Sequence, residues 1–414
     1  MIHVLKKRDI LYLLALIFIL NLALGNIFRV TTEKSDPVSV SVLSDSDSTS
    51  GLPEALPEQS ELSPPDIKIN ARSACVLDFD TGTVLYEKNA YRKRPMASTT
   101  KIMTAIVALE NSTPDVLVPI SGKAANMGGS VMGLKEGSQV LMKDLLYGML
   151  LCSGNDAAVA IAEYCGGSVS GFAEMMNKKA VEIGAYETSF SNPHGLDAEN
   201  HYTTAYDLAK IARYALKNPV FSLIVGTQEY QYGGRTLRST NEMLQGYEGA
   251  DGVKTGYTGL AGRCLVTSAT RNGMRLISAV LFCDTKNQRT ISSSRILDYS
   301  FGKFGYVDLL EQGSIMGEVD IDRGIEMNKI NVGVSDDVVA IMSNDKRDML
   351  FTRVSLPERL TAPVQKGAIL GTVSVFQGER IIAESSLIAM ESVSKKTIKN
   401  YINQVIDNWF RIMR

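Results

Sequence analysis

A serine and a lysine, Ser98 and Lys101, stand three residues apart at the start of an apolar segment, residues 96–105. At helical spacing the two side chains share one face, so the amine can take the hydroxyl proton and create a nucleophile. The lysine must be neutral to do this, which requires burial or a second cation that lowers its pKa. The spacing predicts a serine nucleophile in a turn that opens into a helix, whose first N–H groups face a developing oxyanion.

The Ser-x-x-Lys pattern alone is weak evidence for an enzyme. Ser392 and Lys395 have the same spacing near the C-terminus, where we expect a surface helix cap. Two further motifs of catalytic type follow Lys101 along the chain. Ser153 and Asn155 form a Ser-x-Asn pattern, and Lys254-Thr255-Gly256 is the one Lys-Thr-Gly of the sequence.

Each of these motifs also has a purely structural interpretation. Ser153 or Asn155 suits the N-cap of the apolar helix expected from Ala157, and residues 239–241 repeat the pattern. Lys254 suits an exposed strand that ends in a turn. Only the presence of all three motifs in one chain favours a catalytic role.

A hydrolase of the Ser-His-Asp type is a competing arrangement. It would combine Ser98 with His194 and with Asp197 or Asp207. The sequence has only three histidines, and nothing in it places His194 near Ser98. We therefore expect His194 to be a loop residue with local hydrogen bonds.

Hydrophobic spacing predicts the elements that hold the motifs. We expect a helix that starts at Ser98, because apolar residues recur along it at helical spacing, and its inner face must be buried. The other expected elements are a strand hairpin around the turn 80–82, helices at 143–151 and 157–164, a helix capped by Thr203 or Thr204, and two mid-sheet strands at 264–269 and 275–281.

Composition excludes several classes of protein. The 414 residues are 45% hydrophobic and 21% charged, which is enough apolar material for two packed domains. A net charge of -2 provides no basic surface for nucleic acid, so we expect no nucleic-acid partner. The five cysteines are odd in number and scattered, which favours neither a disulfide framework nor a zinc site.

The N-terminus predicts export. Basic residues 6–8 precede an apolar run at 10–20, and small residues follow at 23–25, where a signal peptidase would cut. We expect a cleaved signal peptide over residues 1–25. An uncleaved membrane anchor is the alternative, because the apolar stretch is only slightly shorter than a span of about 20 residues. Residues 26–66, rich in Ser, Asp, Glu and Pro, predict a disordered linker.

The C-terminal part changes character. Short strand patterns predict a small all-β domain over residues 305–391, which carries no chemical motif of its own. Residues 392–414 predict an amphipathic helix, with Trp409 in its apolar stripe and Lys399 and Arg411 on the opposite side. We expect this helix to lie on a membrane surface rather than on its own protein.

Taken together, the three motifs resemble those of the low-molecular-mass penicillin-binding proteins, specifically the serine-type D-alanyl-D-alanine carboxypeptidases. The resemblance extends to residues 153–157, 193–197 and 254–258 and covers roughly residues 71–304. For the domain at 67–304 it implies an α/β (α+β) fold of the penicillin-binding and β-lactamase type, with an antiparallel sheet flanked by helices. It also implies peptidoglycan stem peptides as substrates, β-lactams as covalent inhibitors, no cofactor or metal, and a location at the outer face of the cytoplasmic membrane.

The resemblance further implies a role for each motif residue. Ser98 would form the acyl-enzyme, Lys101 would accept its proton, and Ser153 would relay a proton to the departing D-alanine. Asn155 would hold the substrate amide and the lysine. The backbone N–H groups of Ser98 and Tyr257 would form the oxyanion hole. Lys254, Thr255 and Gly256 would bind the substrate, with Lys254 and Thr255 on its terminal carboxylate.

Three other functions stay open from the sequence. A class A β-lactamase would add Glu-x-x-x-Asn, but Glu187 and Asn192 are one residue too far apart, so we expect slow deacylation and lasting β-lactam inhibition. A peptidoglycan D,D-endopeptidase is harder to exclude, although such relatives generally lack the C-terminal domain. A non-enzymatic wall-binding protein is the most distant alternative, because the three motifs are intact.

Overall fold

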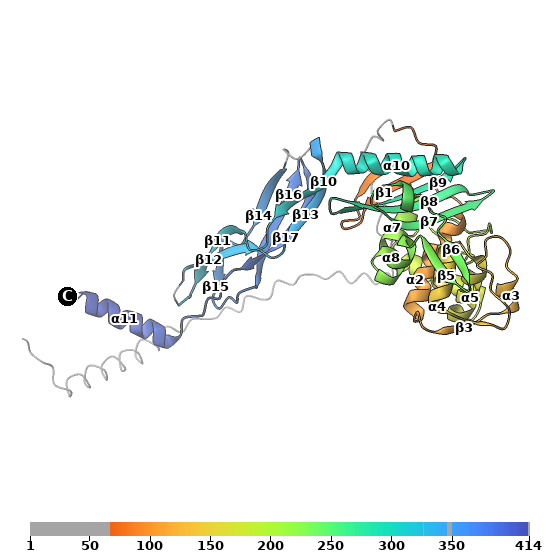
Figure 1. Cartoon of the computed structure of the whole chain (residues 1–414). Helices are drawn as coiled ribbons and strands as arrows, with labels where there is room; N and C mark the ends of the chain where they lie inside the picture. The colour runs from red at the N-terminus through yellow and green to blue at the C-terminus, as the bar shows by residue number, and fades with distance from the viewer. Residues whose placement is uncertain (1–66, 326, 346–349, 413–414) are drawn as a thin grey trace, which may run out of the picture. The chain divides into compact units, whose positions relative to one another are not determined.

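The computed structural model describes residues 67–325, 327–345 and 350–412 (Figure 1). The predicted signal peptide, residues 1–25, and the predicted linker, residues 26–66, lie outside the described residues. Ile67 and Ile69, at the start of the described chain, already pack against one face of the first sheet.

The first sheet is antiparallel and has the strand order β2-β1-β9-β8-β7. Its strands are β1 (Ser73–Asp78), β2 (Val84–Lys88), β7 (Ala250–Thr258), β8 (Gly262–Arg271) and β9 (Met274–Cys283). The hairpin β1–β2 and the interior position of β8 and β9 confirm the strand predictions. Because β7 is the edge strand of this sheet, the Lys-Thr-Gly motif lies on a border that no other strand of the sheet covers.

Both faces of this sheet are buried by helices, as Figure 1 shows. On one face α10 (Lys286–Lys303) places Ile296 and Leu297 in a cluster with sheet residues such as Val76 and Val280. The neighbouring strand residues, such as Leu77 and Leu281, point to the opposite face and join a larger helical core. The predicted α+β architecture, an antiparallel sheet between helices, is therefore confirmed.

The larger core is formed by helices, with two small hairpins at its margin. The helices are α2 (Lys101–Asn111), α3 (Gly122–Ala125), α4 (Met142–Leu150), α5 (Asn155–Gly166), α6 (Val169–Ile183), α7 (Ala205–Leu216) and α8 (Pro219–Gly226). The short helix α9 (Met243–Gly246) instead places Met243 in the cluster with α10. The hairpins are β3 (Leu117–Pro119) with β4 (Gln139–Leu141) and β5 (Glu229–Tyr232) with β6 (Arg235–Arg238).

Helix starts agree with the sequence except around the motifs. Thr204 caps α7, because its side chain accepts a hydrogen bond from Asp207 N. The N-cap of α5 is Gly154, and no side chain caps this helix, so the N-cap interpretation of Ser153 and Asn155 is wrong. Both side chains therefore stay available for other contacts.

The C-terminal part is all-β, as predicted. Strand β10 (Phe304–Leu310) pairs with β13 (Val338–Ser343), and six further strands form a sheet with the order β14-β16-β17-β12-β11-β15. These strands are β11 (Ile315–Asp322), β12 (Lys329–Val334), β14 (Leu350–Ser355), β15 (Arg359–Thr361), β16 (Ile369–Gln377) and β17 (Arg380–Ala389). Buried Val, Ile and Leu side chains give this sheet a core of its own.

The last described element is α11 (Ile398–Ile412). Its apolar side chains are exposed, from Ile398 at 80% to Val405 at 68% and Trp409 at 59%. Among the described residues, no helix is long and apolar enough to cross a membrane.

Candidate active site

Ser98 lies in a short 3-10 helix, η1 (Ala97–Thr100), rather than in the first turn of an α-helix. The α-helix α2 begins only at Lys101, so the expected helix start at Ser98 is wrong. The 3-10 turn is held by its own threonines, because Thr99 Oγ1 donates to Met96 O at 2.6 Å and Thr100 Oγ1 donates to Ala97 O at 2.8 Å. These bonds hold the half-buried serine between buried neighbours.

Two glycines pack directly against this turn. A Cβ on Gly195 would lie 2.0 Å from Ala97 O, and one on Gly256 would lie 3.0 Å from Ser98 N. Gly195 also has a φ of +89°, which a residue with a side chain adopts only with strain. The loop of residues 193–197 and the edge strand β7 can therefore approach the serine only because these positions lack side chains.

Lys101 is fully buried and connects three parts of the chain. Its Nζ donates to Asn155 Oδ1 at 2.8 Å and to the carbonyl oxygen of His194 at 2.6 Å, and it lies 3.0 Å from Ser98 Oγ. These three oxygens surround one amine, so the lysine cannot move away from the serine without losing two other bonds. This geometry places a potential base within proton-transfer distance of the hydroxyl.

The electrostatics of the two lysines favour a neutral base. Burial lowers the pKa of Lys101 well below its ordinary 10.5, and the Lys254 cation lowers it further, while Cys152 and Asp156 act in the opposite direction. Burial lowers the pKa of Lys254 to about 7; Cys152 opposes this and Arg289 adds to it. Lys254 thus lies close enough to Lys101 to favour its neutral form.

Asn155 holds the lysine from the opposite side. Its Nδ2 donates to Gly128 O at 2.8 Å, which orients Oδ1 toward Lys101, and its backbone N donates to Ser130 O at 2.7 Å. Ser153 lies in the same turn, 6% exposed, with a φ of +64°. The sharp turn between α4 and α5 therefore places both motif residues at the buried end of α5.

Strand β7 contributes the remaining motif. Lys254 is 1% exposed and its Nζ donates to Thr255 O at 3.0 Å, so the interpretation as an exposed strand lysine is wrong. Thr255 Oγ1 lies 2.7 Å from Thr240 Oγ1. Tyr257 is 55% exposed, and the guanidinium of Arg263 stacks on its ring at 3.6 Å. The strand thus presents its lysine inward and its tyrosine outward.

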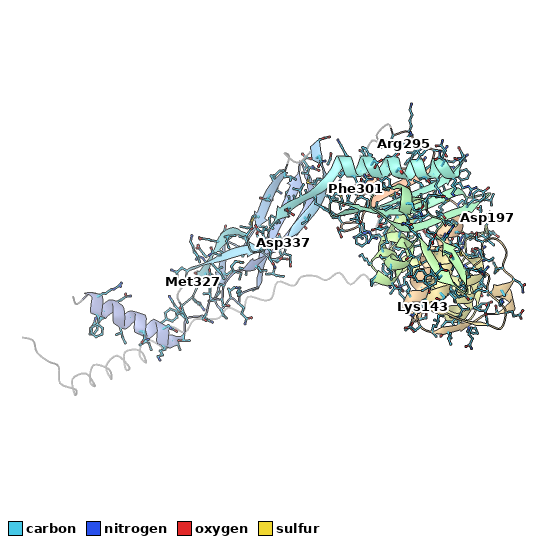
Figure 2. The ribbon with its side chains drawn as sticks, viewed as in Figure 1. Lys143, Asp197, Arg295, Phe301, Met327 and Asp337 are labelled. Atoms are coloured by element: carbon cyan, nitrogen blue, oxygen red, sulfur yellow. The ribbon has the colours of Figure 1, made fainter. Side chains whose placement is uncertain are left out.

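The Ser-His-Asp alternative is wrong. His194 Nδ1 accepts from Leu196 N at 3.2 Å, which is the local role expected of a loop histidine. Asp197, labelled in Figure 2, accepts from Thr258 Oγ1 at 2.7 Å and so ties this loop to β7. Asp207 accepts from Thr188 Oγ1. Neither carboxylate bonds to the histidine.

The second Ser-x-x-Lys pattern has no helical context. Ser392 precedes α11 in an extended segment, and its Oγ accepts from Lys366 N at 2.9 Å. The helix-cap interpretation of this serine is therefore wrong. Among the described residues, no group of three or more His, Cys, Asp or Glu side chains could hold a metal ion.

Sequence reasoning missed several residues that build the site. The carbonyl oxygen of His194 binds Lys101, and the buried carboxylate of Asp156 accepts from the backbone N–H groups of Met132, Gly133 and Leu134. A backbone acceptor leaves no trace in side-chain identity. The only available signal was Asp156 inside the Ser153–Ala157 motif, a charged residue directly before the apolar run of α5.

Comparisons with known proteins agree with this geometry. Residues 58–285 match the family model described as D-alanyl-D-alanine carboxypeptidase, and residues 304–395 match that of the penicillin-binding protein 5 C-terminal domain. The chain is 34% identical to D-alanyl-D-alanine carboxypeptidase DacF of Bacillus subtilis, over 86% of this chain and 94% of that protein. It is 33% identical to DacA of Escherichia coli, over 83% and 89%.

A solved structure extends the similarity to the fold. Penicillin-binding protein 5 from Haemophilus influenzae superimposes with a TM-score of 0.69 at 31% identity, covering 80% of this chain and 99% of that one. The penicillin-binding fold expected from the motifs is thus confirmed together with its β-rich C-terminal part. The chain therefore belongs to the D-alanyl-D-alanine carboxypeptidase family of serine hydrolases.

Proposed function

We propose that this enzyme, a D-alanyl-D-alanine carboxypeptidase by family, removes the terminal D-alanine of peptidoglycan stem pentapeptides through an acyl-enzyme on Ser98. One observation carries the assignment of residues. The amine of Lys101 contacts Ser98 Oγ, Asn155 Oδ1 and the His194 carbonyl. The buried Lys254 lies close enough to lower the pKa of Lys101. A buried lysine whose pKa is lowered in this way can be neutral, and a neutral lysine can accept the proton of the serine.

Acylation follows from these contacts. Ser98 Oγ attacks the carbonyl carbon of the penultimate D-alanine, and its proton passes to neutral Lys101. The backbone N–H groups of Ser98 and Tyr257 would stabilise the oxyanion, each by roughly 3 to 4 kcal/mol as judged from single donors in other hydrolases. The tetrahedral intermediate then collapses to an ester on Ser98.

The leaving group departs on the other side. Ser153 relays the proton to the nitrogen of D-alanine, so that the peptide bond breaks as a neutral amine forms. Lys254 and Thr255 bind the free carboxylate of that D-alanine, while Gly256 lets the substrate approach the strand backbone. Water then hydrolyses the ester and regenerates the serine.

The decisive test measures product and covalent labelling together. The purified protein is incubated with a peptide that ends in D-Ala-D-Ala, free D-alanine is quantified, and a fluorescent penicillin is used to label the serine. We expect both signals to vanish in Ser98→Ala and to persist in the matched control Ser392→Ala, whose Oγ only binds Lys366 N. Normal labelling without D-alanine release would refute the carboxypeptidase assignment and favour a D,D-endopeptidase.

We also propose that β-lactams inhibit the enzyme for long periods. A class A β-lactamase needs a glutamate that activates the deacylating water. Here the Glu187 carboxylate pairs with Lys93 at 2.7 Å, and the Glu187 backbone N–H donates to Asp207 of α7 at 2.8 Å, so this glutamate is engaged away from Ser98. Stable labelling over hours after removal of free penicillin is expected, whereas release within minutes would contradict it.

We further propose that the protein is exported and rests on the outer face of the cytoplasmic membrane through α11. The exposed apolar stripe of this helix, with Trp409 in it and Arg411 on the opposite side, suits the interface between lipid headgroups and acyl chains. The full chain should co-sediment with vesicles that contain phosphatidylglycerol. Trp409→Glu should abolish this, but Asn403→Glu, which adds the same charge on the polar face, should weaken it far less; equal effects would refute the orientation.

A further inference from the structure

His201 is a buried histidine that the proposed mechanism does not use. It is 6% exposed and lies in the loop before α7, next to the Phe190 ring at 6.0 Å between centroids. Burial lowers its pKa to about 4, against the opposing influence of Asp197, so the ring is neutral at neutral pH. Its two nitrogens connect this loop to the turn that carries the nucleophile.

The hydrogen bonds determine which nitrogen carries the proton. His201 Nδ1 lies 3.0 Å from Ser191 N, a backbone N–H that can only donate, so Nδ1 is the acceptor. The proton of the neutral ring therefore resides on Nε2, which donates to Thr100 Oγ1 at 2.8 Å. Thr100 in turn directs its single hydroxyl proton to Ala97 O at 2.8 Å. The chain thus runs in one direction, from Ser191 N–H through His201 and Thr100 to the Ala97 carbonyl.

The end of this chain is the peptide unit that precedes the nucleophile. A peptide unit is planar and trans, so the carbonyl oxygen of Ala97 and the N–H of Ser98 point in opposite directions from the same rigid plane. Fixing the oxygen therefore fixes the direction of the N–H. A hydrogen bond to the oxygen also polarises the unit and makes its N–H a stronger donor.

This peptide unit lies within η1, so the Thr100 hydroxyl adds a side-chain restraint to the backbone bonds of the 3-10 turn. Ala97 has a φ of +50°, which an alanine adopts only when its surroundings enforce it. Gly195 and Gly256 make room around Ala97 O and Ser98 N without contributing a side chain. The Thr100 hydroxyl supplies the directional contact, and His201 determines where that hydroxyl points.

We propose that His201 is a positioning residue that acts through Thr100 to aim the Ser98 N–H at the oxyanion. This inference rests on the proposed function, because it assumes that the Ser98 N–H is an oxyanion donor. It assigns to the loop between residues 191 and 201 a role in transition-state stabilisation. In this proposal the His201 N–H occupies the Thr100 oxygen, so the Thr100 hydroxyl proton is directed to the Ala97 carbonyl and not to solvent.

The test measures the second-order rate of acylation by a fluorescent penicillin, and kcat and KM for D-alanine release. Loss of one oxyanion donor costs about 100-fold to 1,000-fold in other hydrolases, so its misdirection should cost about 10-fold to 100-fold. We expect this loss in His201→Ala and in Thr100→Val, mainly in kcat. Thr100→Ser, which keeps the hydroxyl, and His201→Gln, which keeps one acceptor and one donor, should recover most of the rate.

A double variant separates a relay from a general loss of packing. Because both residues act on one peptide unit, His201→Ala with Thr100→Val should be no slower than Thr100→Val alone. The matched control is Thr267→Val, which removes another fully buried threonine hydroxyl, bonded to Ser293 on the α10 side, and should leave acylation unchanged.

Several outcomes would overturn the proposal. These are acylation within twofold of wild type in Thr100→Val, additive losses in the double variant, or Thr100→Ser as slow as Thr100→Val. If His201→Ala does not fold, the Thr100 pair and His201→Gln still decide the matter. An inactive wild type would refute the proposed function instead, so the two failures are distinguishable.

Discussion

Replacing Lys254 by methionine should stabilise the protein while destroying its activity. Lys254 is 1% exposed, and burial lowers its pKa from 10.5 to about 7. The charged amine therefore destabilises the folded state, because it loses the hydration that it has in the unfolded chain. Each tenfold change in proton affinity corresponds to about 1.4 kcal/mol. The cost is therefore about 5 kcal/mol when both states are protonated and about 4 kcal/mol at neutral pH.

The sign of the pH dependence follows from proton binding. Between the folded pKa of about 7 and the unfolded value of 10.5, the unfolded chain holds a proton that the folded protein lacks. Stability of the wild type therefore rises with pH across this window, and the cost disappears as pH approaches the unfolded value. Methionine has no proton to lose. The advantage of Lys254→Met should thus be largest below neutral pH and vanish near pH 10.5.

Thermal unfolding of both proteins across this pH range checks the reasoning. For a domain of this size, 1 kcal/mol shifts Tm by roughly 2 to 4 °C, so the gain near neutral pH should be about 8 to 16 °C. Lys178→Met, at an exposed helix position, is the control and should show no such trend. A difference in Tm between Lys254→Met and wild type that stays constant with pH would refute the assignment of the cost to a buried charge.

Three further perturbations test the site. On the alkaline side kcat/KM should fall above about pH 7, through KM, because Lys254 loses the charge that we propose binds the substrate carboxylate; a flat profile up to pH 9 would contradict this. Gly195→Ala should cost at least about 2 kcal/mol in denaturant unfolding, since its Cβ would lie 2.0 Å from Ala97 O, whereas Gly302→Ala meets nothing within 4 Å. Asn155→Ala should lower kcat about 10-fold to 100-fold by freeing Lys101, and unchanged acylation of a fluorescent penicillin would exclude that role.

The sequence by itself determined the family and most elements. Side-chain types at fixed spacing identify Ser98 with Lys101, and hydrophobic periodicity identifies the hairpins and helices, because both signals are local. The cap at Thr204 and the interior strands β8 and β9 followed from the same local rules. Residue identity also predicted the family, which the comparisons confirm.

Local rules failed where several segments meet. The sequence suggested an α-helix starting at Ser98, but packing of Gly195 and Gly256 against the serine's turn accompanies a 3-10 geometry instead. The N-cap role expected for Ser153 or Asn155 was also wrong, because Asn155 bonds to Lys101 across 54 positions of the chain.

Only the tertiary structure decided how the amines behave and how the serine is held. The lowered pKa of Lys101 arises from burial and from Lys254, a residue far away in sequence, so no local pattern can encode it. The carbonyl contact of His194 and the bond from His201 to Thr100 likewise join distant loops through backbone atoms and ring nitrogens. Sequence specifies which groups are available, whereas desolvation and hydrogen-bond direction exist only once the chain has folded around them.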